Sequence, residues 1–91
     1  MKLLAGDQDD LSRAVLLTLT RRHDSMTYVI RNCLTMDRVG RDWRGISTDQ
    51  VLSACRRLQR LGHVEEAPTS YVVQKCWRAT DAGRAAIEAG S

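Results

Sequence analysis

The chain has 91 residues, 43% of them hydrophobic, and its aromatic residues are two Trp and two Tyr, with no Phe. This length supports one small domain with an aliphatic core, which suits a helix-rich fold better than a β-sandwich. The formal net charge is +3, and no apolar run is long enough for a membrane span or a secretory signal. We therefore expect a single domain over 1–91, located in the cytoplasm.

Two helices are predicted in the first part of the chain. After a leader over 1–8, apolar residues recur at helical intervals, with aspartates before them and the basic run 21–23 after them, as the helix dipole favours. A second periodic segment follows Ser25, which we expect to cap it, and this segment lacks the strict alternation of a strand. The periodic positions are Leu11, Ala14, Val15 and Leu19 in the first segment and Met26, Val29, Ile30, Cys33 and Leu34 in the second.

The segment 37–45 is predicted to be a loop, because it combines two glycines with many charged residues. Trp43 lies inside it, and we expect its ring to be buried and to hold the loop against the core. Stacking of Trp43 on a nucleic-acid base is the alternative. Arg41 and Arg44 flank this tryptophan.

A third helix is predicted over 48–61. Val51, Cys55 and Leu58 fall at i, i+4 and i+7, and Leu61 continues the same apolar side. A side chain at 47 or 48 can cap the start of this helix, and a glycine at 62 can adopt the positive φ that ends it. The opposite side carries Asp49, Gln50, Ser53, Ala54, Arg57 and Arg60.

Two extended runs follow and predict a β-hairpin over 63–79, turning at 68–70. In its second strand we expect the odd-numbered residues from 71 to 77 on one face and the even-numbered residues from 72 to 78 on the other. Thr80 and Asp81 then begin a short C-terminal helix over 81–89, with alanines as small contact residues. The expected fold class is therefore α+β and mostly α, with three core helices, a two-stranded hairpin and a last short helix.

The positive charge is concentrated in the middle of the chain. Residues 1–20 carry two basic and three acidic groups, residues 21–60 carry nine Arg against four Asp, and residues 61–91 carry three basic and four acidic groups. The net charges are thus −1, +5 and −1, which sum to +3. Arginine suits bidentate contacts to phosphate and guanine, although a solvated helix surface would show the same bias.

Nothing in the sequence indicates an enzyme, a metal site or a cofactor. Cys33, Cys55 and Cys76 are widely separated, and with His23 and His63 they show no zinc-site spacing. We expect the cysteines to act as small hydrophobic residues in a reducing compartment. The chain also lacks a glycine-rich phosphate loop and a nucleophile with its base at a recognisable spacing.

The order of three helices, a hairpin and a short helix resembles the winged helix-turn-helix family, which includes MarR-type and PadR-type bacterial transcription regulators. The likeness extends through the predicted helices to nearly the whole chain. It is specific for the fold and weak for the subfamily. The residues that carry it directly are Ile46, Ser47, Val51, Cys55, Leu58, Gly62 and Val64, then Trp77, Thr80 and Gly83 in WRATDAGR.

The resemblance implies that the helix 48–61 enters the major groove of DNA and that the hairpin touches the adjacent backbone or the minor groove. It also implies that base edges or nearby phosphates are faced by Thr48, Gln50, Ser53 and Arg57. Physical reasoning adds that Arg57 suits a bidentate contact to guanine and Gln50 a contact to adenine. An exposed Arg57 paired with Asp49 or Glu65 is the alternative. Ser47 and Thr48 sit where a helix N-terminus offers N–H groups to phosphate. The expected DNA-binding residues are Ser47, Thr48, Gln50, Ser53, Arg57, Arg60, Arg41 and Arg44.

Two functions follow from this interpretation. The first is a small bacterial or phage transcription regulator that binds duplex DNA, expected to be a dimer because one short helix supplies few specific contacts. The second is a protein-interaction module on the same scaffold, for example a phage or mobile-element protein that modulates a host complex. The second is favoured by the short length and by a hairpin tip without Lys or Arg. Asp49 in the first turn of the third helix and the long connection before that helix count against DNA binding.

Overall fold

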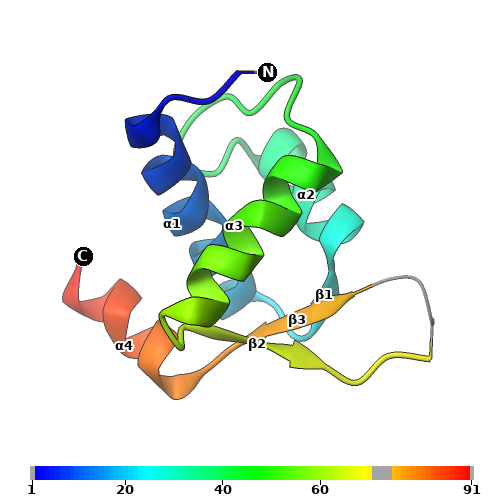
Figure 1. Ribbon diagram of the computed structural model, residues 1–91, viewed down its shortest axis with the longest axis vertical. Coiled ribbons are helices and arrows are strands. Elements are labelled where there is room, and N and C mark those ends of the chain that lie inside the picture. Colours follow the sequence, from blue (N-terminus) through cyan, green and yellow to red (C-terminus); the bar gives the residue numbers. More distant parts are fainter. Residues whose placement is uncertain (1, 71–74, 91) are drawn as a thin grey trace.

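The computed structural model describes residues 2–70 and 75–90, and within them it contains four helices and a three-stranded antiparallel sheet. Three helices pack together and the sheet lies at one end of them, with the last helix beside its base (Figure 1). The elements in chain order are α1 (Ala5–Arg21), β1 (Ser25–Met26), α2 (Thr27–Asp37), α3 (Thr48–Arg60), β2 (Val64–Ala67), β3 (Cys76–Ala79) and α4 (Asp81–Ala89).

The first helix begins earlier than the sequence indicated. We expected 1–8 to be a leader, but α1 starts at Ala5. The carboxylate of Asp7 accepts a hydrogen bond from the backbone N–H of Leu4 at 3.2 Å, which satisfies a donor at the start of the helix. Leu3 packs against the hydrophobic core, so the residues before the helix are anchored as well.

Strands β2 and β3 form the predicted hairpin, paired from Val64 opposite Ala79 to Ala67 opposite Cys76. The expected alternation over 71–74 lies outside the described residues. The sheet has the order β1-β3-β2, and its third strand, β1, was not predicted. Ser25 lies in β1 opposite Trp77, and Met26 rather than Ser25 occupies the N-cap position of α2. The Ser25 hydroxyl donates to the backbone carbonyl of His23 at 3.0 Å instead of capping the helix.

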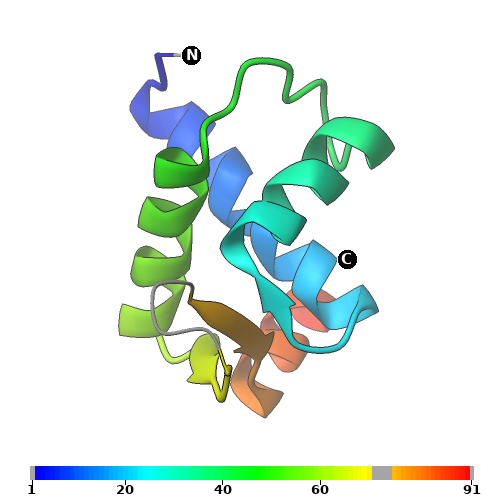
Figure 2. The same ribbon diagram turned by 90° about the vertical axis from the view of Figure 1, so that its right-hand side faces the viewer.

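Both tryptophans are fully buried in the core. The indole N–H of Trp43 donates to the carbonyl oxygen of Val39 at 2.6 Å, which confirms Trp43 as the anchor of the connection between α2 and α3. Ile46 and Val39 are buried in the same connection, so it is packed although it is long. Figure 2 shows this connection arching over the ends of α2 and α3. The indole N–H of Trp77 donates to the hydroxyl of Thr27 at 3.0 Å, which ties β3 to the start of α2.

The last helix is attached closely to the base of the hairpin. The Thr80 side chain caps α4, and its hydroxyl also donates to the carbonyl of Gly62 at 2.6 Å. Gly83 is buried against the backbone of His63. Among the described residues, none of the helices combines the length and the apolar composition that crossing a bilayer requires.

Candidate nucleic-acid interface

Helix α3 divides into a buried apolar side and an exposed polar side. Val51, Cys55 and Leu58 are buried as predicted, because this side packs on α1, α2 and β2. Two positions differ from the sequence analysis. Ala54, which we placed on the polar side, is fully buried, and Leu61, which we placed on the apolar side, is 66% exposed. Leu61 leaves the stripe because the helix ends at Arg60, and the chain turns at Gly62 with φ +77°.

The N-terminus of α3 is closed by a reciprocal pair of hydrogen bonds. The Ser47 hydroxyl accepts from the backbone N–H of Gln50 at 3.1 Å, and the side-chain oxygen of Gln50 accepts from the backbone N–H of Ser47 at 2.9 Å. This capping box satisfies two donors that a helix otherwise leaves unpaired. Two of the residues predicted to contact DNA therefore hold the start of α3 in shape.

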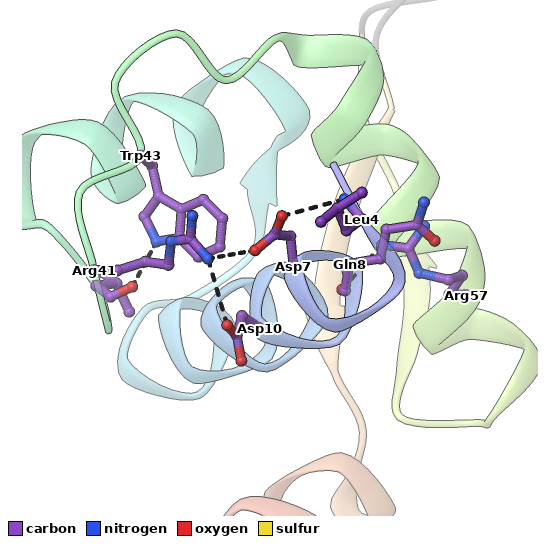
Figure 3. Close-up of polar contacts among 8 residues, drawn as sticks. Leu4, Asp7, Gln8, Asp10, Arg41, Trp43 and Arg57 are labelled. Carbon is purple, nitrogen blue, oxygen red and sulfur yellow. Dashed lines mark hydrogen bonds and ion pairs between the residues drawn. The ribbon is translucent and has the colours of Figure 1, made fainter. Parts of the chain in front are cut away.

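Arg57 reaches across to α1 rather than into solvent. Its Nε donates to the hydroxyl of Ser12 at 3.1 Å, and its Nη2 donates to the backbone carbonyl of Gln8 at 3.2 Å. Figure 3 shows the Arg57 side chain lying beside Gln8 at the start of α1. The alternative pairing with Asp49 or Glu65 is not the one formed.

Arg41 contacts the same helix from its other flank (Figure 3). One guanidinium nitrogen lies 2.8 Å from a carboxylate oxygen of Asp7 and 3.4 Å from one of Asp10. The guanidinium carbon is also 4.9 Å from the centre of the Trp43 ring. The hydrogen bond from Arg41 lowers the pKa of the Asp7 carboxyl below its ordinary value. The guanidinium group of Arg41 is therefore already paired with acidic side chains of α1.

The remaining predicted residues lie at the surface. Arg44 is 83% exposed and has a local ion pair with Asp42 at 3.5 Å. Thr48, Ser53 and Arg60 are exposed on α3, and their side chains have no hydrogen bond or ion pair with the described residues. Asp49, Ser53 and Arg60 share one exposed side of α3, and Thr48 is exposed at the N-terminus of the helix.

The charges of the hairpin are neutralised within the domain. Glu66 lies 3.0 Å from Arg56 and 3.4 Å from Lys75, and Glu65 lies 2.7 Å from Arg78. The hydrogen bond from Arg56 is the main reason why the pKa of Glu66 is lowered. Sequence reasoning missed Arg56, whose guanidinium carbon is 5.2 Å from the centre of the buried Trp77 ring. Exposed pairs of this kind contribute little to stability, but they cancel charge that a polyanion could use.

A hollow of about 270 Å³ opens between the start of α1 and the flank of α3. It brings together three predicted residues, Gln50, Ser53 and Arg57, and it adds Lys2, Leu3 and Gln8. Lys2 was missed because we treated 1–8 as a leader, and no pattern in the sequence places it beside α3. The distances from Arg57 to Ser12 and Gln8 show how closely the two helices approach here.

No protein-family model and no curated protein matches this chain. Solved structures do match it. A transcriptional regulator from Clostridium thermocellum superposes with a TM-score of 0.72 at 17% identity, covering 98% of this chain and 84% of that one. ZitR from Lactococcus lactis superposes with a TM-score of 0.69 at 17% identity, covering 94% of this chain and 58% of that one. A PadR family transcriptional regulator from Eggerthella lenta superposes with a TM-score of 0.66 at 22% identity, covering 89% of this chain and 72% of that one.

These superpositions and the element order define a winged helix-turn-helix fold, in which α3 is the third helix and the β2–β3 hairpin follows it. The expected fold class, mostly helical α+β, is confirmed. The structures from Clostridium thermocellum and Eggerthella lenta are those of transcriptional regulators. At these identities the likeness is one of fold, and a fold carries many activities.

Proposed function

We propose that this protein is a small transcription regulator that binds duplex DNA with α3 in the major groove. The observation that carries the proposal is the outward surface of α3, where Thr48, Ser53 and Arg60 are exposed without partners among the described residues. The apolar side of the same helix is buried in the core, so α3 is held rigidly while its polar side remains available. We propose no catalytic role and a cytoplasmic location.

The proposed contacts follow from the position of each side chain along α3. Thr48 and Ser53 lie in the first two turns, and the N-terminal part of a recognition helix is the part that approaches base edges. Arg60 lies about 18 Å beyond Thr48 along the helix axis, at about 1.5 Å per residue, and would reach the backbone on the other side of the groove. Arg44 is exposed in the loop before α3 and would contact a phosphate. Arg41 would bind DNA only by leaving Asp7 and Asp10.

Because the charges of the hairpin are paired, we expect the wing to contribute little to the affinity for DNA. Arg56, Lys75 and Arg78 already face glutamates, so few phosphates can be neutralised there. We expect a moderate salt dependence set mainly by α3 and the loop before it. A homodimer would double the number of contacts, and we include it in the proposal for that reason.

Fluorescence anisotropy with a labelled pool of random duplexes, measured across a salt series, tests this proposal. The protein should bind at low salt, and the logarithm of its affinity should fall linearly with the logarithm of salt concentration. Arg60→Ala should weaken binding, whereas Arg84→Ala removes the same charge from α4 and should leave binding nearly unchanged. Absence of binding at low salt would refute the proposal.

A protein-interaction module is the second candidate, and two observations favour it. The charges of the wing cancel within the hairpin, and Arg41 is paired with acidic side chains of α1. Under this alternative a stoichiometric protein partner would be retained by the purified chain after nuclease treatment, with no DNA in the complex.

A further inference from the structure

We propose that the hollow between the start of α1 and α3, lined by Lys2, Leu3, Gln8, Gln50, Ser53 and Arg57, is a binding site for one phosphate group. In its full form the inference rests on the proposed function, because a phosphate of the DNA backbone would then be the ligand. Arg57 is accordingly assigned to the backbone and not to a guanine base.

The charge of the lining separates this hollow from the other described ones. Lys2 and Arg57 contribute two cations, Ser53 contributes a hydroxyl group, and no carboxylate lines the hollow. Each of the three other described hollows contains an aspartate, namely Asp24, Asp10 and Asp37 in turn. A carboxylate repels phosphate at short range. Among the four described hollows, the one between α1 and α3 therefore has the lining that best suits an anion.

The Arg57 guanidinium is already held in position. Its Nε and Nη2 are tied to the Ser12 hydroxyl and the Gln8 carbonyl, while its Nη1 has no partner among the described residues. A guanidinium fixed in this way loses little rotamer freedom when it binds an anion. The same two bonds oppose the extension of Arg57 toward the floor of the groove.

The position of Ser53 connects the hollow to the outer surface of α3. Ser53 lines the hollow, and it is also one of the exposed residues that face outward from the helix. A duplex against the outer face of α3 would therefore bring its backbone to the opening of the hollow. Lysine, arginine and serine side chains are common donors to backbone phosphates.

Titration with inorganic phosphate tests the site without DNA. In ¹⁵N-labelled protein at constant ionic strength, the backbone amide of Ser53 and the Nε–H of Arg57 should shift saturably with phosphate and not with chloride. In Arg57→Ala the shift of Ser53 should be lost, whereas in Arg84→Ala it should persist. Arg84 is the matched control because it also donates to a backbone carbonyl of α1, that of Thr20 at 3.2 Å. A shift that does not saturate, or that persists in Arg57→Ala, would overturn the site.

Binding to duplex DNA across a salt series identifies the source of the phosphate. Arg57→Ala should weaken binding equally for different sequences and reduce the salt slope by about 1, the value for one lost phosphate contact. Lys2→Ala should act in the same direction while leaving the bonds from Arg57 to α1 intact, so a folding defect cannot explain its effect. Loss of preference at one base pair with an unchanged slope would show that Arg57 reads a base, and would overturn the inference. If phosphate binds saturably but no duplex binds, the hollow is a binding site for a free phosphate group, and the proposed function is refuted.

Discussion

Gly83 lies where α4 meets the start of β2, and replacing it with alanine tests how closely these elements are joined. A Cβ at this position would clash with the backbone carbonyl oxygen of His63, and it would lie 2.9 Å from the carbonyl carbon and 3.1 Å from Cδ1 of Leu16. The same carbonyl accepts a hydrogen bond from the backbone N–H of Thr80 at 3.0 Å. The alanine therefore cannot be accommodated unless α4 moves away from the hairpin.

The magnitude follows from two opposing effects. Overpacking of a filled site costs about 1–3 kcal/mol, and the upper half of that range applies because the nearest atoms of His63 belong to the backbone and cannot rotate away. Replacement of glycine by alanine inside a helix contributes about 0.5–1 kcal/mol in the other direction. We expect Gly83→Ala to lower the free energy of unfolding by about 2 kcal/mol, a fall in Tm of roughly 10 °C for a domain of this size.

Urea denaturation followed by circular dichroism measures this change through the midpoint, with the slope m unchanged. Gly6→Ala is the matched control, because Gly6 is also helical and a Cβ there meets nothing within 4 Å. It should be neutral or should raise stability by up to about 1 kcal/mol. Equal effects of the two substitutions would show that the contact between Gly83 and His63 does not limit packing.

Three further predictions concern α3 and the cysteines. Ser47→Ala should lower the free energy of unfolding by about 1 kcal/mol through loss of the cap, and an unchanged urea midpoint would contradict this. Asp49→Asn should raise affinity for duplex DNA at low salt, because it removes a carboxylate from the surface that would face phosphates. Fluorescence anisotropy measures this affinity, and no gain would show that Asp49 lies outside the interface. Burial raises the pKa of the Cys55 thiol to about 12. At pH 8 a thiol reagent should therefore label the half-buried Cys33 first and Cys55 only when the domain opens. Mass spectrometry of the labelled protein checks this order.

The helices could be predicted from the sequence because their core positions recur locally. Val51, Cys55 and Leu58 define α3 by spacing alone, and all three are buried. The spacing misplaced Leu61, because a periodic pattern does not show where a helix ends. It missed β1 because two residues are too short to show a strand pattern, and β1 exists only through pairing with β3, some fifty residues later.

The polar part of the candidate site was less accessible to sequence reasoning. The spacing along α3 identified which residues lie on its outer side, but it could not show what they contact. Arg57 binds Ser12 and Gln8, and Arg41 binds Asp7, all in a segment that lies 34 or more residues earlier in the chain. Such partners are set by how the helices pack, which local patterns do not reveal.

The buried Trp43 has a consequence for how any partner meets this side of the domain. The ring and its bond to Val39 hold the ten residues between α2 and α3 in one shape before binding. Little chain entropy then remains to be lost on association, and a complex should form at a rate set by diffusion and charge instead of by loop closure. The free and the bound protein should accordingly superpose in this region.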